Sequence, residues 1–184
     1  LKIIRKKSKI LIALGACAIL GGPQEIKDYR GNKSRLIRQI YPNIRGIDNP
    51  NVKSVKEMIK VDLEIPGCPI NKEEFFEIIN KVIKGEIPKI EQKPVCEECP
   101  RKNNMCLLLL EKPCLGAISL AGCGAPCPKS NFPCDGCRGP RKGINLNAMK
   151  KALIVKARLN EKEINFILER FGSKNEFYKY ENTY

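Results

Sequence analysis

The sequence predicts an α/β fold in which an incomplete parallel sheet is followed by an irregular cysteine-rich module and a short helical tail. Two short apolar segments, around Ile12 and Leu63, have the pattern of strands. Eight cysteines then fall between Cys96 and Cys137, and helical periodicity returns at Asn145. On this basis the 184 residues divide into three parts: 1–88, 94–140 and 145–184.

The first strand is predicted in the run Lys9–Gly15, whose apolar centre lies between basic residues and a glycine, as in a buried parallel strand. The alternating segment Val61–Ile65 predicts the second strand. Each strand leads into a turn that presents a cysteine, Cys17 or Cys68, at the place where open α/β sheets bind ligands. Two strands are too few for a doubly wound sheet, so further strands are expected upstream of Leu1, where the chain begins like the end of a helix.

The segment between the two strands is expected to be a long surface excursion. Residues 23–56 are polar and rich in Pro, Asn and Gly, with a modest helix expected around 35–40. After the second strand, Asn71 and Glu74 have the spacing of a capping box that opens a helix, and Gly85 has the position that follows a helix end. The sheet is therefore expected to be flanked by at least one well-defined helix.

The C-terminal part is predicted to be helical from Asn145 onward. Asn160 and Glu163 form a second capping-box pattern, and Gly172 is expected to end that helix. The last residues, 178–184, are expected to form a loose tail.

The formal net charge of +14 by itself suggests a nucleic-acid or acidic-membrane partner. Its distribution weakens this reading, because residues 1–60 hold 14 basic against 4 acidic side chains, whereas the segment Cys96–Cys137 holds four of each. A lysine-rich surface or a docking face for an acidic protein explains the charge better. The absence of histidine excludes Cys/His zinc fingers and His-dependent triads. The apolar run Ile10–Leu14 is far too short to span a bilayer.

Eight of the ten cysteines share one stretch of irregular, Gly- and Pro-rich sequence. The stretch lacks the periodicity of a conventional core, so we expect a bound group to hold it together. The eight thiols divide into two consecutive sets of four. The first set is Cys96, Cys99, Cys106 and Cys114, and the second set is Cys123, Cys127, Cys134 and Cys137.

Disulfides, zinc and iron–sulfur clusters could each use eight thiols. Disulfide frameworks are typical of small secreted chains, whereas this chain is long enough to bury a core without them. Four-cysteine zinc sites usually pair two CxxC motifs across a gap, but the two CxxC motifs here stand at opposite ends of the stretch. A four-iron cluster needs four thiolates, and irregular backbone can wrap it while amides hydrogen-bond its sulfurs. The spacing therefore favours clusters, as do the pairs Cys68-Pro69, Cys99-Pro100 and Cys127-Pro128.

Taken alone, Cys17 and Cys68 could be ordinary buried cysteines, since cysteine is among the most often buried residues. The turns around them, Gly15-Ala16-Cys17 and Pro66-Gly67-Cys68-Pro69, argue for a site instead. Both readings stay open on the residues alone.

Seven stretches, in order along nearly the whole chain, resemble the small, electron-transferring subunit of nickel–iron hydrogenases. The pattern is most similar to the delta-type subunit of cytoplasmic sulfhydrogenases, with the F420-linked hydrogenases of methanogens nearby. The stretches are Ala13–Ala18 with Gly21-Gly22, Ile65–Pro69, Pro94–Cys99, Cys106–Leu109, Pro113–Gly116, Ala121–Cys123 with Cys127-Pro128, and Pro133–Gly139.

The resemblance implies that residues 1–88 are the C-terminal part of a flavodoxin-like domain that holds a proximal [4Fe-4S] cluster beside the nickel–iron site of a large subunit. Cys17 and Cys68 would supply two of its ligands, and a segment upstream of this chain the other two. The resemblance further implies a distal [4Fe-4S] cluster on the first set and a medial one on the second set. Relatives with a three-iron medial cluster carry Pro where Cys127 stands, so a four-iron cluster is expected here.

The implied function is electron relay in a cytoplasmic, heteromeric hydrogenase, between the large subunit and a flavin- or ferredoxin-type partner. The enzyme would oxidise or evolve hydrogen, with sulfur reduction as a further reaction, and this chain would carry no catalytic residue. One alternative is a zinc-binding structural or nucleic-acid-binding module, which the neutral cysteine stretch and its single aromatic residue, Phe132, disfavour. The other is a protein like the small subunit of respiratory complex I, a family that shares the flavodoxin-like part but lacks the eight-cysteine module.

Overall fold

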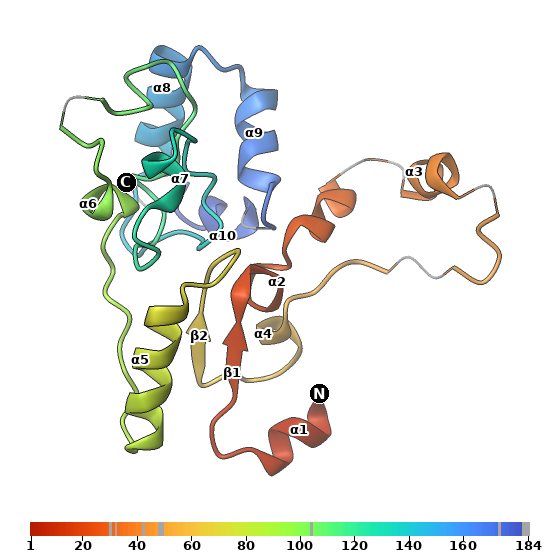
Figure 1. Cartoon of the computed structure of the whole chain (residues 1–184). Coiled ribbons are helices and arrows are strands. Elements are labelled where there is room, and N and C mark those ends of the chain that lie inside the picture. Colours follow the sequence, from red (N-terminus) through yellow and green to blue (C-terminus); the bar gives the residue numbers. More distant parts are fainter. Residues whose placement is uncertain are drawn as a thin grey trace.

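Two short strands, β1 (Ile12–Leu14) and β2 (Leu63–Ile65), pair in parallel at the centre of the computed structural model (Figure 1). Ile12 pairs with Leu63 and Leu14 with Ile65, which confirms both predicted strands and their parallel direction. Within the described part of the chain, these two strands make up the whole sheet. The structure describes residues 1–29, 31, 33–41, 43–47, 50–103, 105–172 and 174–181.

Short helices cover the sheet. The helix α2 (Gly15–Leu20) follows β1 without a connecting loop and buries Ala16, Ile19 and Leu20. The helix α5 (Lys72–Ile83) contributes Ile78 to a second apolar group with Leu63 and Ile65. The N-terminal helix α1 (Lys2–Lys7) confirms the helix end predicted at the start of the chain, and its Arg5 forms an ion pair with Asp62 just before β2.

The excursion between the strands contains three short helices: η1 (Pro23–Tyr29), α3 (Lys33–Ile40) and α4 (Val55–Met58). The helix α3 confirms the helix expected around 35–40, and among the described elements it contacts η1 and lies away from the sheet (Figure 1). By contrast, η1 contacts the C-terminal helices, and the Tyr29 hydroxyl donates to the Gly172 carbonyl at 3.5 Å. Residues 30, 32, 42, 48 and 49 of this excursion lie outside the described part of the chain.

The helix α5 begins as predicted at Asn71, whose side chain accepts hydrogen bonds from the backbone N–H groups of Glu73 and Glu74. Gly85 follows its end with a positive φ of 86°, a conformation that glycine adopts at little cost. The predicted capping box is only half right, because the carboxylate of Glu74 binds Arg138 through both oxygens. The spacing predicts that the Glu74 carboxylate accepts from the Asn71 backbone N–H, but in the folded chain it accepts from Arg138 instead.

The cysteine-rich segment is mostly irregular and contains two single-turn helices, α6 (Val95–Glu98) and α7 (Pro126–Lys129). Isolated antiparallel bridges join Pro94 to Leu120 and Ser119 to Pro140. These bridges fold the segment back on itself, so that its two ends meet.

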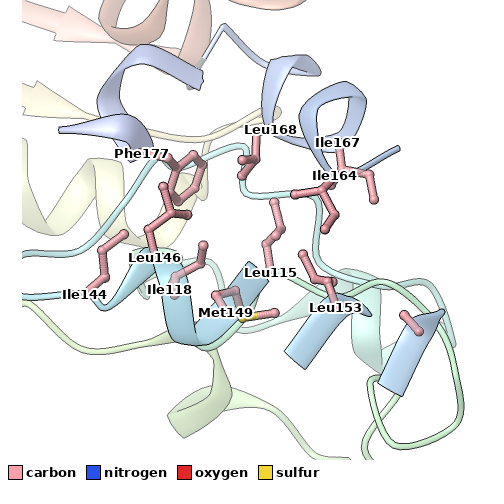
Figure 2. Packing of buried hydrophobic residues seen from close by; sticks show 11 residues of the cluster. Leu115, Ile118, Ile144, Leu146, Met149, Leu153, Ile164, Ile167, Leu168 and Phe177 are labelled. Carbon is pink, nitrogen blue, oxygen red and sulfur yellow. The ribbon is translucent and has the colours of Figure 1, made fainter. Parts of the chain in front are cut away.

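The main hydrophobic core joins this segment to the C-terminal helices α8 (Leu146–Ala157), α9 (Glu161–Glu169) and α10 (Lys174–Tyr178) (Figure 2). Leu115 and Ile118 come from the cysteine-rich segment and are buried against these helices. The expectation that the segment, which lacks periodicity, cannot make a conventional core is therefore corrected, because it shares one with the C-terminal helices. It forms one because turns, rather than periodic elements, place these two side chains in the core.

The helix predicted from Asn145 onward and the capping box predicted at Asn160 are both present. Asn145 caps α8, and Asn160 and Glu163 form a complete capping box at the start of α9. The loose tail predicted for 178–184 is wrong for its described residues, because Tyr178 and Tyr180 pack against the core next to the fully buried Phe177. Residues 182–184 lie outside the described part of the chain. Among the described helices, none has the length and apolarity needed to cross a bilayer.

Candidate functional site

The cysteines that follow the two strands lie at the same edge of the sheet. Leu14 and Ile65 are paired in register, and Cys17 and Cys68 each stand three residues beyond them. The two turns are joined directly, since the Ala16 N–H donates to the Gly67 carbonyl at 2.9 Å. Both thiols are exposed, which rules out the reading of two ordinary buried cysteines.

A glycine leaves room beside the Cys17 sulfur. An ideal Cβ on Gly22 would lie 2.6 Å from Cys17 Sγ, and the φ of Gly22 is +77°. The thiol itself donates to the Gln24 side-chain oxygen at 3.7 Å. The space at this sulfur is thus kept by backbone that only glycine fits.

The cysteines of the first set lie close enough to one another to interact electrostatically. Burial raises the pKa of the Cys96 thiol to about 11, and the neighbouring thiols of Cys114, Cys106 and Cys99 raise it further. The Cys114 sulfur accepts a hydrogen bond from the Cys134 N–H at 3.3 Å. Backbone N–H donors to sulfur are a feature that tunes bound clusters.

The second set lines one cavity of about 310 Å³. All four thiols have a raised pKa caused mainly by burial; that of Cys137 reaches about 11, and Cys134 is the most buried of the ten cysteines. Cys68 also lines this cavity, together with Pro69 and Ile70. The cavity is therefore shared by the second set and the turn after β2.

Buried thiols are poor ligands until a metal drives off their protons. Within the described residues, no three or more His, Cys, Asp or Glu side chains are grouped as they would be around a single metal ion. A four-iron cluster makes a different demand, because each of its four thiolates binds a different iron and the ligands enclose a volume. A cavity lined by four cysteines, and a glycine cradle at Cys17, fit such a group.

Comparison with known proteins agrees with this chemistry. Residues 1–82 match the family described as NADH ubiquinone oxidoreductase, 20 Kd subunit. The chain is 38% identical over 155 residues to the delta subunit of sulfhydrogenase 2 from Pyrococcus furiosus, covering 83% of this chain and 64% of that protein. It is also 35% identical over 179 residues to a subunit of the vhu F420-non-reducing hydrogenase from Methanocaldococcus jannaschii, covering 79% of this chain and 61% of that protein. The chain is similar to proteins named as subunits of hydrogenases.

The similarity to these two hydrogenase subunits confirms the resemblance seen in the seven stretches of the sequence. A further similar protein, from Archaeoglobus profundus, is named as an iron-sulfur subunit of F420-non-reducing hydrogenase; it is 29% identical, with 76% of this chain and 59% of that protein covered. The similar proteins are named as subunits of hydrogenases, which are oxidoreductases. The chain spans about three-fifths of the length of these relatives.

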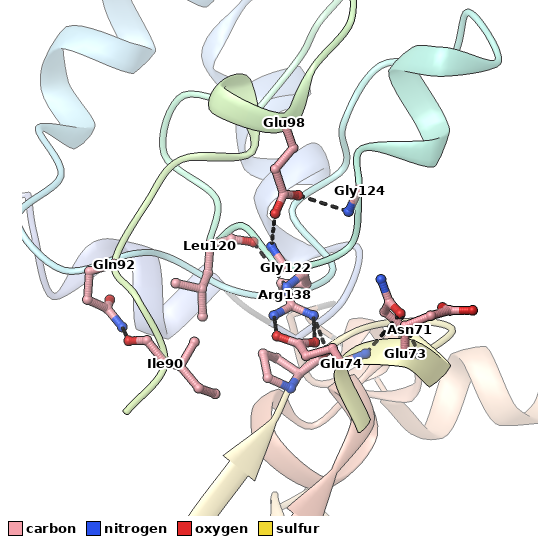
Figure 3. A network of polar contacts seen from close by, with 11 residues as sticks. Asn71, Glu73, Glu74, Ile90, Gln92, Glu98, Leu120, Gly122, Gly124 and Arg138 are labelled. Atoms are coloured by element: carbon pink, nitrogen blue, oxygen red, sulfur yellow. Dashed lines mark hydrogen bonds and ion pairs between the residues drawn. The ribbon is translucent and has the colours of Figure 1, made fainter. Parts of the chain in front are cut away.

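In this relative of hydrogenase subunits, polar residues outside the cysteine pattern support the site (Figure 3). Arg138, in the turn after Cys137, forms a two-pronged ion pair with Glu74. Glu98, inside the first CxxC motif, accepts hydrogen bonds from the N–H groups of Gly122 at 2.7 Å and Gly124 at 2.9 Å (Figure 3). These contacts hold the two sets and α5 in a fixed arrangement.

The sequence interpretation missed Arg138, Glu98 and Gln24 as site residues. Arg138 carries a usable signal, since it is a charged residue directly after a cysteine in a stretch with few charges. Glu98 and Gln24 carry no such sequence signal, because an exposed acidic or amide side chain near a turn is common. Their roles follow only from the tertiary contacts.

Proposed function

We propose that this chain is the electron-transfer subunit of a nickel–iron hydrogenase, which relays electrons through iron–sulfur clusters between the nickel–iron site of a large subunit and a flavin- or ferredoxin-type partner. The observation that carries the proposal is a cavity lined by Cys123, Cys127, Cys134 and Cys137, in a chain that is similar to subunits of hydrogenases. The complex would oxidise or evolve hydrogen in the cytoplasm, with sulfur reduction as a further reaction.

The proposed ligand assignments follow the two sets. The first set would bind a distal [4Fe-4S] cluster and the second set a medial one, while Cys17 and Cys68 would supply two ligands to a proximal cluster. Residues 1–88 would form part of a flavodoxin-like domain, 94–140 the two-cluster module and 145–184 the helical tail. When bound, such clusters supply one-electron carriers whose potentials depend on hydrogen bonds and solvent access.

The residues of the chain itself would exclude water, orient sulfurs and donate hydrogen bonds. Two N–H groups, of Gly116 and Cys134, hydrogen-bond to the Cys114 sulfur and would stabilise its thiolate form. Arg138 would do the same electrostatically at Cys123, whose pKa it lowers against the larger effect of burial. No acid, base or nucleophile of this chain is needed for the relay.

The test is the content of iron, acid-labile sulfide and zinc in anaerobically purified protein. Two complete four-iron clusters predict about eight iron and eight sulfide per chain, and a completed third site predicts about twelve of each. Zinc near two per chain without sulfide would contradict the proposal and favour a zinc-binding structural module.

Single substitutions then assign the ligands. Cys99→Ser is expected to remove the first-set cluster and leave the second, and Cys127→Ser is expected to do the reverse. Each variant serves as the control for the other. Equal loss of iron from both sites in both variants would contradict the assignment into two sets.

A further inference from the structure

The turn that carries Cys68 is built into the wall of the second-set site. Cys68 lines the same cavity as all four cysteines of the second set. Burial raises the pKa of the Cys137 thiol, and the backbone of Cys68, which lies close to this thiol, acts in the opposite direction. Two proposed cluster sites therefore adjoin through a single peptide group.

Arg138 holds this turn in place. Its Nη1 donates to the Pro66 carbonyl at 2.7 Å, and its Nε donates to the Leu120 carbonyl at 3.1 Å (Figure 3). Its two terminal nitrogens donate to the two carboxylate oxygens of Glu74, each at 2.7 Å. One side chain thus joins the end of β2, the start of α5 and the strand-like stretch at Leu120.

The guanidinium is almost completely enclosed. The side chain of Arg138 is 1% exposed and that of Glu74 is 16% exposed. Gly122 packs so tightly against both partners that any Cβ there would collide with Arg138 Nη2 and Glu74 Oε1. A planar fork with fixed donor directions suits these partners, whereas a lysine ammonium offers only a single charged point.

We propose that the buried Arg138–Glu74 pair is a positioning device that presses the Cys68 turn against the Cys137 sulfur, and so sets the contact between the Cys17/Cys68 site and the second-set site. The inference rests on the proposed function, because it concerns the two cluster sites assigned there. Arg138 acts on the sulfur of Cys137 through the turn that it holds.

The experiment uses the anaerobically purified hydrogenase complex that contains the full-length chain. Arg138→Lys keeps the charge but loses the fork, and Glu74→Gln keeps the shape but loses the ion pair. Arg158→Gln is the matched control, because Arg158 pairs with Glu111 at the surface, where their side chains are 76% and 57% exposed. Iron and sulfide content, the electron paramagnetic resonance spectrum of the reduced protein and the midpoint potential of each cluster are measured for all four proteins.

Both variants at the buried pair are expected to keep their iron and sulfide. Their reduced spectra should lose the magnetic interaction between the Cys17/Cys68 cluster and the second-set cluster, and the second-set potential should shift. The first-set cluster is an internal reference and should keep its potential, and Arg158→Gln should match the wild type throughout.

Two results would overturn the inference while leaving the proposed function intact. One is an unchanged interaction spectrum and an unchanged second-set potential in both variants. The other is equal loss of clusters at the first and second sets, which would show a general role in folding; if Arg138→Lys does not accumulate, Glu74→Gln decides alone. A wild-type protein without iron or sulfide would instead overturn the proposed function itself.

Discussion

Gly116 lies between two sulfur atoms of the first set, and its N–H hydrogen-bonds to that of Cys114. An ideal Cβ at this position would lie 3.3 Å from Cys96 Sγ and 3.7 Å from Cys114 Sγ. Gly116→Ala is therefore expected to crowd the first-set sulfurs and to reduce the iron content by about four atoms per chain. Iron analysis of anaerobic protein measures this directly. Gly31→Ala is the control, because no atom of the described residues lies within 4 Å of its added Cβ, and wild-type iron in both variants would contradict the prediction.

A second prediction for a single residue concerns the carboxyl group of Glu25 and the pH dependence of folding stability. Burial raises its pKa from 4.5 to about 6, and one of its oxygens is enclosed without a hydrogen-bond partner in the described part of the chain. The folded protein thus binds this proton more tightly than the unfolded chain. The resulting contribution to stability is complete below about pH 4.5 and is lost as the pH rises through about 6.

Glu25→Gln removes the charge at every pH. The variant is expected to melt at a higher temperature than the wild type near about pH 8 and at the same temperature near about pH 4. Thermal unfolding at the two pH values checks this, with Glu73→Gln on the exposed face of α5 as control. A difference of the same size at both pH values would show that the effect does not arise from titration of Glu25.

At the scale of elements, the start of α5 links a local cap to the buried ion pair. The Asn71 side chain accepts two backbone hydrogen bonds, from Glu73 at 2.9 Å and Glu74 at 3.2 Å. Asn71→Ala is expected to lower the free energy of unfolding by about 1 kcal/mol. Urea unfolding measures the change. The control is Asn80→Ala at an exposed position of the same helix, and an equal effect there would show that the cap contributes nothing.

Elements of this chain follow from sequence where the decisive interactions are local. Asn160 and Glu163 are three residues apart, and the capping box that they predict is present. Glu74 has the same spacing from Asn71, yet its carboxylate binds an arginine 64 residues away. Both patterns look alike in sequence, because the competing partner is brought close only by the fold.

The candidate site, too, has features that the sequence predicts and features that depend on the fold. The grouping of the cysteines into two sets is a prediction from their spacing, and the structure places all four cysteines of the second set around one cavity. The contact between Cys68 and the second set could not be read, because it depends on how the turn after β2 meets a loop some seventy residues later. Sequence thus indicates which thiols act together but not how the sites are joined.

At the scale of the whole molecule, a single core ties the cysteine-rich segment to the C-terminal helices. Phe177 of α10 is completely buried beside Leu115, Leu146 and Leu168 (Figure 2). The loose tail predicted for 178–184 begins directly after Phe177, yet Tyr178 and Tyr180 also pack against the core. The burial of the Phe177 ring shows that α10 is part of the hydrophobic core.

Phe177→Ala is expected to lower the free energy of unfolding by about 3–5 kcal/mol, because it leaves a cavity in a closed core. Urea unfolding gives the value. The control is Phe76→Ala, since Phe76 is 62% exposed on α5 and its loss should change stability by less than about 1 kcal/mol. Similar small changes in both variants would mean that the C-terminal helix contributes little to the core.

The hydrogen bond from Cys134 to the Cys114 sulfur crosses from one cysteine set to the other, and the Leu115 N–H returns the contact by donating to the Cys134 carbonyl at 2.8 Å. The two sets are therefore interlaced rather than placed one after the other. A graft of 96–116 would leave behind the Cys134 N–H, one of the two amides that support Cys114, whereas a graft of 94–140 with the C-terminal helices that bury Leu115 and Ile118 would keep it. The iron content of the shorter and longer grafts in a common host would show this directly, and full loading of the shorter graft would contradict it.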